Sequence, residues 1–253
     1  MTRALITNDD GIDSAGLHAL ARLALDLGLD VVVAAPSRES SGASASLGAV
    51  EDHGHIVTET RAIEGLESAR VLAVQAAPAL IVRAATHGAF GPAPDLVLSG
   101  INQGANTGHA VLHSGTVGAA FTARAFGRPA LAVSLDSGGD LWHWETATGL
   151  AEPLVRWLMM RHDTPAVLNL NVPNVGADAV RGLRRAPLAT FGAVQTKVSE
   201  RGHGYVRLEY REVDVTAEPD SDAALLAHRW ACVTPLLAIS EADDVDLGDL
   251  TPR

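Results

Sequence analysis

The chain of 253 residues has one cysteine and few aromatic residues. Cys232 has no second cysteine with which to form an internal disulfide, so we expect it to be a small buried hydrophobic residue. Aromatic side chains make up 4% of the sequence, whereas apolar residues make up 47%. This balance is more typical of helices packed on a parallel sheet than of an aromatic-rich β sandwich.

Positive charge is also scarce. Lys and Arg number 19 against 30 Asp and Glu, a net charge of −11. A negative chain without a basic run argues against a stable complex with nucleic acid. There is no signal-peptide-like apolar start and no run of membrane-spanning length, so we expect a cytoplasmic protein that does not bind membranes. Five acids crowd the last thirteen residues and predict a solvated tail: Glu241, Asp243, Asp244, Asp246 and Asp249.

Three enzyme signatures are missing. The chain has no G-x-S-x-G pentapeptide, and its first predicted strand is followed by "NDDG" rather than G-x-G-x-x-G. That strand also ends in adjacent aspartates, whereas a haloacid-dehalogenase-type phosphatase requires D-x-D. These absences disfavour a serine hydrolase, a dinucleotide oxidoreductase and that class of phosphatase.

Short apolar runs alternate with helical patterns through the first 185 residues. Helices are predicted from Ser14 to Gly28, from Pro78, over 116–127 and over 141–160. Strands are predicted at 3–7, 30–36, 70–76, 94–100, 129–135 and 166–173. Regular alternation of this kind predicts an α/β fold with a parallel sheet.

The pattern changes after about residue 186. Residues 204–215, "GYVRLEYREVDV", alternate apolar and charged side chains as a half-exposed strand would. Such a strand can form an arm that packs on another subunit, or a hairpin at the edge of its own chain. We therefore divide the chain into a core over 1–185 and a C-terminal extension over 186–253, made of a strand or hairpin arm, a helix, a strand and the acidic tail.

Polar loops follow three of the predicted strands. They are "TNDDG", "PSRESSGASASLG" and "INQGANTGHAVLHSGT", and none supplies a Lys. Because ligands bind beyond the carboxyl ends of parallel strands, these loops are expected to meet at one rim. The carboxylates of Asp9 and Asp10, with a Ser hydroxyl and an Asn carbonyl, would suit Mg²⁺, Mn²⁺ or Ca²⁺. A cation would remove the repulsion between the two acids, although a solvated turn also explains them.

A second feature lies at the start of a predicted helix. The hydroxyls and backbone N–H groups of Ser114, Gly115 and Thr116 could hold an anion there. An ordinary helix cap explains the tripeptide by itself, whereas its place on the rim of a metal site indicates a phosphate-binding turn.

Together these segments resemble the SurE family, metal-dependent nucleoside monophosphate phosphatases (5′/3′-nucleotidases) also called survival proteins. The resemblance covers residues 3 to about 237 and rests on "TNDDGI", "APSRESSGASASL", "PDLVLSGINQGANTG", "HSGTVGAA", "RPALAVSL", "NLNVP" and "SDAALLAHRWACVTPL". It implies a Rossmann-like three-layer core, a C-terminal extension that exchanges between subunits, and a homodimer or homotetramer.

The resemblance also implies roles for individual residues. One divalent cation per subunit, Mg²⁺ or Mn²⁺, would be bound by Asp9, Asp10, Ser41 and Asn102, and the two aspartates would be catalytic. Asn106, Ser114, Gly115 and Thr116 would hold the phosphate, and Gly42, Ala43 and Ser44 would shape the pocket. His113 is either the acid that protonates the leaving group or a histidine packed beside the helix.

The implied reaction is hydrolysis of nucleoside 5′- or 3′-monophosphates to nucleoside and phosphate. A phosphatase for short polyphosphate or another small phosphomonoester, and a nucleotide-binding module without turnover, are the alternatives. The chain departs from the family pattern at Ser37, where members often carry Asp, and at His109, Ala110 and His113. The metal site is intact, so these departures bear on the preference for base and chain length.

Overall fold

The computed structural model describes residues 1–49, 51–53, 55–139, 141–161, 167–190, 194–212, 218–237 and 240, with backbone alone at 51–52, 194–198 and 208–212. The five acids of the expected tail lie outside these ranges.

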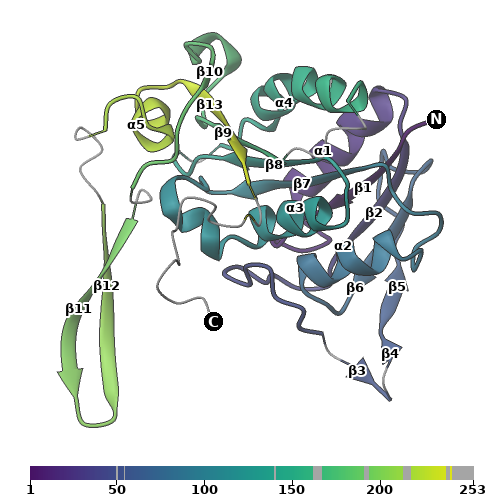
Figure 1. Ribbon diagram of the computed structural model, residues 1–253, viewed down its shortest axis with the longest axis horizontal. Coiled ribbons are helices and arrows are strands. Elements are labelled where there is room, and N and C mark those ends of the chain that lie inside the picture. The colour runs from purple at the N-terminus through teal and green to yellow at the C-terminus, as the bar shows by residue number, and fades with distance from the viewer. Residues whose placement is uncertain are drawn as a thin grey trace, which may run out of the picture.

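The core is a nine-stranded sheet in the order β10-β13-β9-β8-β7-β1-β2-β6-β5 (Figure 1). The strands are β1 (Arg3–Thr7), β2 (Asp30–Pro36), β5 (Thr58–Thr60), β6 (Arg70–Val74), β7 (Leu96–Gln103), β8 (Ala130–Leu135), β9 (Val167–Val172), β10 (Leu183–Arg185) and β13 (Ala231–Leu236). All neighbours are parallel except β5 with β6 and β13 with β9. The six strands predicted from the sequence are therefore confirmed, as is their parallel arrangement.

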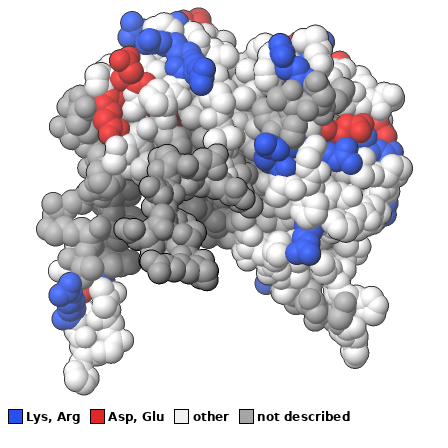
Figure 2. Space-filling view, in the orientation of Figure 1, with Lys and Arg blue, Asp and Glu red and all other residues white. Residues whose placement is uncertain are grey.

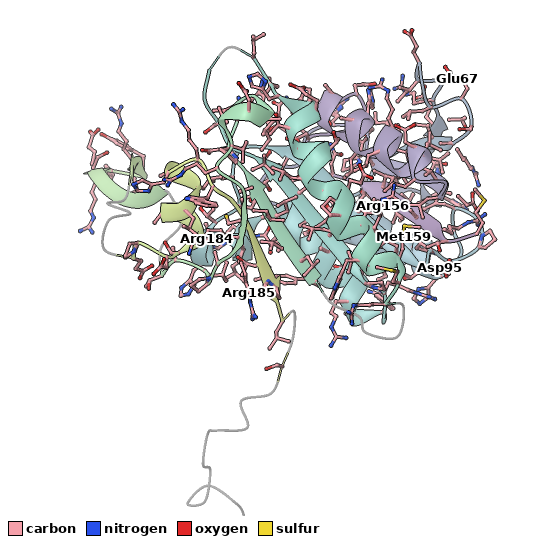
Figure 3. The ribbon with its side chains drawn as sticks, turned by 90° about the horizontal axis from the view of Figure 1, so that it is seen from above. Glu67, Asp95, Arg156, Met159, Arg184 and Arg185 are labelled. Carbon is pink, nitrogen blue, oxygen red and sulfur yellow. The ribbon has the colours of Figure 1, made fainter. Side chains whose placement is uncertain are left out.

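Helices cover both faces of this sheet. α1 (Ala15–Asp26) and α4 (Trp144–Met159) pack on one face, and α2 (Pro78–Thr86) and α3 (Gly115–Ala125) on the other. Viewed from above, α4 crosses the near face of the sheet, with Arg156 and Met159 marking it (Figure 3). The arrangement is the three-layer α/β fold that the sequence predicts.

Side-chain alternation explains why both faces need a helix layer. In β1, Ala4 and Ile6 belong to the core beneath α1 and α4, whereas Leu5 belongs to the core beneath α2 and α3. Successive residues of a strand point to opposite faces, so a wholly apolar strand such as this one must be covered on both sides.

The first helix begins and ends where the sequence predicts. The Ser14 hydroxyl accepts a hydrogen bond from the Leu17 N–H at 3.3 Å, which caps the start of α1. Gly28 follows the last turn with φ of +74°, a conformation that glycine adopts without strain.

The C-terminal part of the chain has two components. β11 (Val194–Gly202) and β12 (Tyr205–Glu212) form a separate antiparallel hairpin that projects from the body, as Figure 1 shows. After α5 (Asp222–Ala227), β13 enters the main sheet between β9 and β10. Cys232 lies in β13 and is fully buried, as expected.

The smaller elements lie between these. They are a two-stranded ribbon of β3 (Glu51–Asp52) and β4 (His55–Ile56), and the 3₁₀ helices η1 (Gly108–His113) and η2 (Ala177–Ala179).

Charge is scattered over the described surface. Lys and Arg side chains form separate small groups on the face in Figure 2, without a continuous basic area among the residues coloured there. Within the described ranges, every helix is too short or too polar to cross a membrane.

The strand order creates a topological switch point between β1 and β7. β1 and β7 are parallel neighbours, with Thr7 opposite Ser99, but the chain leaves them in opposite directions. α1 follows β1 onto one face, and α3 follows β7 onto the other. In open α/β sheets, ligands bind where the connections diverge in this way. The site is therefore expected between the β1 loop and the β7 loop.

Candidate metal and phosphate site

The loop after β1 is held in shape by Asn8. Its fully buried carboxamide donates to the Gly11 carbonyl at 3.1 Å and to the Ser14 hydroxyl at 2.7 Å, and accepts from the Gly11 N–H at 3.2 Å. Gly11 has φ of +100°, which allows the tight turn. The sequence reasoning missed Asn8, although an Asn before a glycine-containing turn commonly bonds its own backbone in this way.

Asp9 is directed inward by this turn. Its side chain is 4% exposed, so the solvated turn considered for the two acids is wrong for Asp9. The Thr116 hydroxyl donates to Asp9 Oδ1 and also lies 3.3 Å from Asn102 Oδ1. Three residues that the sequence assigned to the site therefore meet at the switch point between β1 and β7.

The backbone at the start of α3 is very close to the same carboxylate. A Cβ atom at Gly115 would lie 2.7 Å from Asp9 Oδ2 and 2.8 Å from Asp9 Cβ. This spacing accounts for glycine at position 115, because any larger residue would have to displace Asp9.

Burial shifts the acidity of both aspartates. It raises the pKa of Asp9, although hydrogen bonds from the Thr116 hydroxyl and from the N–H groups of Thr116 and Gly115 oppose the change. Burial, with a smaller contribution from the charge of Asp9, raises the pKa of Asp10 to about 6. The Gln103 N–H, 3.4 Å from Asp10 Oδ2, partly counteracts this shift.

The raised pKa values of Asp9 and Asp10 bear on whether these residues suit a bound cation. Among the described residues, no Lys, Arg or His forms an ion pair with either aspartate. Two neighbouring carboxylates that are partly removed from water and lack a positive partner favour a bound cation. Their carboxylate oxygens and Asn102 Oδ1 are all oxygen donors, the type that hard divalent cations prefer.

Asn102 is aimed by an irregularity in β7. The register of β7 on β8 shifts between Ser99 and Asn102. The Asn102 amide then donates to the Gly104 carbonyl at 2.7 Å, which turns its carbonyl oxygen toward Thr116. Such shifts commonly re-aim a side chain beside a binding site.

The loop after β2 reaches the site through its backbone. The Ser40 N–H donates to the Asp9 carbonyl at 2.8 Å. Ser41, expected to be a metal ligand, is exposed and its hydroxyl donates to Glu39 Oε1 at 2.8 Å. The structure therefore brings the Ser41 loop to Asp9, while the Ser41 hydroxyl bonds elsewhere.

The next residues of this loop cross over α3. The Ser44 hydroxyl donates to the Leu112 carbonyl at 2.6 Å, and a Cβ atom at Gly118 would lie 2.3 Å from the Ser44 carbonyl oxygen. Gly42 adopts φ of +77°, and the Ala43 N–H donates to the Ser40 carbonyl at 3.1 Å. Of the three residues expected to shape the pocket, Ser44 thus packs against the first turn of α3, whereas Gly42 and Ala43 form the turn of the loop that leads to it.

The predicted phosphate turn has two functions in the structure. The buried Ser114 hydroxyl accepts from the Val117 N–H at 3.1 Å, so Ser114 is the cap of α3. The N–H groups of Gly115 and Thr116 act on the Asp9 carboxylate. His113, the residue before the turn, is exposed.

Asn106 is fixed from beneath by β8 and β9. Its side-chain amide donates to the Ser134 hydroxyl at 2.8 Å. Its backbone is bonded by Asn169 and Asn171, two fully buried residues of β9. The sequence identified the "NLNVP" segment as part of the resemblance but gave these two residues no role.

Several known proteins resemble this chain along most of its length. The model of the family described as "Survival protein SurE" matches residues 4–195. A "5'-nucleotidase SurE" of Coxiella burnetii (strain Dugway 5J108-111) is 34% identical over 239 residues, which cover 92% of this chain and 88% of that protein. A protein of the same name from Legionella pneumophila (strain Lens) is 34% identical over 238 residues, 92% of this chain and 90% of its own length.

A solved structure shows the same fold. The crystal structure of the SurE protein from Aquifex aeolicus superimposes with a TM-score of 0.78, at 28% identity and 96% coverage of both chains. With a family match over most of its length and relatives above 30% identity, the chain belongs to the SurE family.

Proposed function

We propose that the protein is a divalent-metal-dependent phosphomonoesterase that hydrolyses nucleoside 5′-monophosphates to nucleoside and phosphate. The observation that carries this proposal is the pair of neighbouring aspartates at the switch point, Asp9 buried and Asp10 half-buried, beneath the start of α3. The names of the relatives support the substrate class, because both are 5′-nucleotidases and match along nearly the whole chain. The cytoplasmic location expected from the sequence is part of the same proposal.

Asp9, Asp10 and Asn102 are the residues that would hold the metal, with Ser41 joining them after its hydroxyl leaves Glu39. When bound, a divalent cation neutralises phosphoryl charge and makes water a better nucleophile. Mg²⁺ and Mn²⁺ both accept such a site because all of the available ligand atoms are oxygen.

The start of α3 and the Asn106 side chain would bind the phosphate. The N–H groups of Gly115 and Thr116 point toward Asp9 and provide positive potential at the start of α3. Asn106 offers a side chain whose position is fixed by Ser134. Fixed donors of this kind are the main source of rate enhancement in phosphoryl transfer, because they need no reorganisation as charge develops.

His113 is the proposed donor of a proton to the leaving oxygen. It is exposed and immediately precedes the phosphate turn, so its ring can approach a substrate ester without disturbing the core. General acids of this kind contribute about 100- to 10,000-fold.

The assembly is proposed to be a homodimer or homotetramer. The β11–β12 hairpin, which projects from the body in Figure 1, would pack on a neighbouring subunit. This role follows from the hairpin's separation from the main sheet and from the resemblance described above.

Phosphate release from AMP, GMP and CMP, with Mn²⁺ or Mg²⁺ and with EDTA, tests the function. We expect metal-dependent release by the wild type and a loss of about 1000-fold or more in Asp9→Asn. Asp13→Asn is the matched control, because Asp13 is an exposed acid in the same loop. Full activity of Asp9→Asn, or activity that survives EDTA, would contradict the proposed site.

The same assay separates the remaining alternatives. Nucleotide binding without release would indicate a binding module. If phosphate is released faster from 3′-monophosphates or from short polyphosphate, that compound and not the 5′-monophosphate is the preferred substrate.

A further inference from the structure

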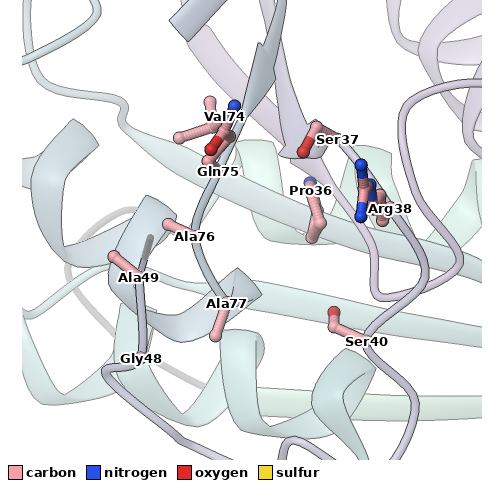
Figure 4. Close-up of a pocket in the computed structure, with 10 residues that line it drawn as sticks. All are labelled: Pro36, Ser37, Arg38, Ser40, Gly48, Ala49, Val74, Gln75, Ala76 and Ala77. Carbon is pink, nitrogen blue, oxygen red and sulfur yellow. The ribbon is translucent and has the colours of Figure 1, made fainter. Parts of the chain in front are cut away.

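A cavity of about 520 Å³ (Figure 4) lies beside the loop after β1 that carries Asp9 and Asp10, called the aspartate loop below. It is formed by the residues at the carboxyl ends of β2 and β6 and by the segment at Gly48 and Ala49. Its volume lies within the range of small-molecule binding sites, about 300–1000 Å³.

The cavity and the aspartate loop share a wall. Ser40 lines the cavity, and its N–H bonds the Asp9 carbonyl at 2.8 Å. β2 is the direct neighbour of β1 in the sheet, and β6 is the next strand beyond it. Adjacent strands lie roughly 5 Å apart, so the cavity begins roughly 5–10 Å from the β1 loop. A molecule with its phosphate at Asp9 can extend its other end into this cavity.

The walls combine apolar groups with polar groups that have no partner in the part of the chain that the structure describes. Pro36, Val74 and Ala77 contribute apolar surface. The Gln75 carboxamide and the Arg38 guanidinium form no hydrogen bond or ion pair with any residue in the described ranges. Arg38 is also the sole charged group among the cavity's lining residues.

The backbone that carries these side chains is fixed. The Ser37 N–H donates to the Val74 carbonyl at 2.8 Å, and the Gln75 N–H donates to the Val57 carbonyl at 3.0 Å. The Ala77 N–H donates to the Gly48 carbonyl at 2.8 Å. The Gln75 side chain is thus presented from a rigid position while its amide and its carbonyl oxygen stay available.

These features match the two parts of a nucleoside. A carboxamide offers one acceptor and two donors, which complement the polar edge of a nucleobase. Ser37 directly follows β2, the position from which nucleotide-binding α/β folds commonly contact a ribose. The apolar walls suit the flat face of the base.

We infer that this cavity binds the ribose and base of the substrate, and that Gln75 is a specificity-determining residue that hydrogen-bonds the edge of the base. The inference rests on the proposed nucleotidase function and adds the place where the nucleoside lies. Arg38 lines the cavity and is exposed, so its guanidinium can stack on the base.

The test compares nucleotides with p-nitrophenyl phosphate, an ester without a nucleoside. We expect Gln75→Leu to change the ratio of kcat/KM between AMP and CMP by about tenfold or more, through KM. Ala77→Phe, which fills the cavity, should lower kcat/KM for AMP relative to p-nitrophenyl phosphate by about tenfold or more. Thr60→Val is the matched control, because Thr60 is an exposed residue on the neighbouring strand β5, outside the cavity.

A second measurement keeps this inference separate from the nucleotidase activity. Saturation-transfer NMR with adenosine, without metal, should show binding to the wild type and to Asp9→Asn, and loss of binding in Ala77→Phe. If no ester is hydrolysed but this pattern holds, the proposed function fails and the nucleoside subsite stands. Equal losses with AMP and p-nitrophenyl phosphate in both cavity variants, or adenosine binding that Ala77→Phe leaves unchanged, would overturn the inference.

Discussion

The Asn171 side chain binds both backbone polar groups of Asn106. Asn171 Oδ1 accepts from the Asn106 N–H at 2.7 Å, and Asn171 Nδ2 donates to the Asn106 carbonyl at 3.0 Å. Asn169 donates to the same carbonyl at 2.9 Å. The carboxamide thus makes the two backbone hydrogen bonds that a neighbouring strand would otherwise make. It fixes the loop after β7 to β9 at Asn106, the residue proposed to bind phosphate.

Replacing Asn171 should therefore weaken phosphate binding as well as the fold. In Asn171→Leu the Asn106 N–H loses its partner, which costs about 1–3 kcal/mol of unfolding free energy. We expect a lower Tm and a KM for AMP raised by about tenfold. Asn174→Ala is the control, because the Asn174 amide bonds the carbonyls of Gly138 and Leu141 in another loop. An unchanged KM in Asn171→Leu would show that the contact is structural only.

Thr116 should control metal affinity through Asp9. Thr116→Val removes the hydroxyl that donates to the Asp9 carboxylate, so the pKa of Asp9 rises further and protons compete better with the cation. Loss of such supporting hydrogen bonds commonly lowers metal affinity by about 10- to 100-fold. Calorimetric titration with Mn²⁺ measures this change.

Two other variants show whether the Thr116 hydroxyl is the cause of the change in metal affinity. Thr116→Ser keeps the hydroxyl and should retain affinity close to that of the wild type. Thr122→Val removes a hydroxyl from the same helix that bonds the Gly118 carbonyl, and it should leave metal binding unchanged. Equal affinities for Thr116→Val and Thr122→Val would count against a role of Thr116 in metal binding.

Gly115 should tolerate no side chain. In Gly115→Ala the new methyl group meets Asp9 Oδ2 at 2.7 Å, so the carboxylate has to move by several tenths of an ångström. A displacement of this size at a metal ligand should lower kcat/KM by about 100-fold. Gly149→Ala is the matched control: nothing lies within 4 Å of the new methyl group, and alanine should stabilise α4 by about 0.5–1 kcal/mol. Wild-type activity in Gly115→Ala would show that Asp9 can move without consequence.

The parts of this structure that depend on local sequence could be predicted. Apolar runs such as 3–7 and the cap at Ser14 determine their own strand and helix, and the resemblance identified Asp9, Asn102 and Thr116. Parallel topology then explains why these three meet. The orientation of Ser41 could not be predicted, because its hydrogen bond to Glu39 depends on the path of an exposed loop.

Contacts between distant segments were also missed. β13 pairs with β9 and β10, and no local pattern indicates which strand edge it joins. Gln75 and Ser37 line one cavity because the ends of β2 and β6 lie in register, with Pro36 opposite Val74. Asn169 and Asn171 did leave a signal, since two polar residues spaced by two in a buried strand must share one face.

The raised pKa of Asp10 predicts how the metal-free protein responds to pH. Its folded value of about 6 exceeds the ordinary value of 3.8, so the folded state favours the protonated acid. Asp10 therefore contributes its full stability below about pH 4, and that contribution is lost as the pH rises through about 6. In EDTA, Asp10→Asn should lack this loss and be more stable than the wild type at pH 7 by about 1 kcal/mol, after allowance for its exposure.

Calorimetric melting at several pH values measures the difference between the two proteins. Asp13→Asn removes the same charge from an exposed position and should follow the wild-type curve. With Mn²⁺ present, the wild type should become more stable than Asp10→Asn, because the cation binds the folded state alone. A wild-type protein that gains stability over Asp10→Asn between pH 4 and 7 in EDTA would contradict the assigned shift.

The β11–β12 hairpin should control assembly. A two-stranded hairpin is marginally stable in water without a packing partner, and this one forms a sheet of its own. Near its turn, Tyr205 and Val206 are 53% and 59% exposed. We expect the double variant Tyr205→Ser/Val206→Ser to shift the mass in solution from a multiple of the chain mass toward that of one chain, measured by light scattering after gel filtration. Leu141→Ser/Met160→Ser removes apolar side chains elsewhere that are even more exposed, at 73% and 76%, and should leave the mass unchanged. If both double variants keep the wild-type mass, the subunits associate through a different surface.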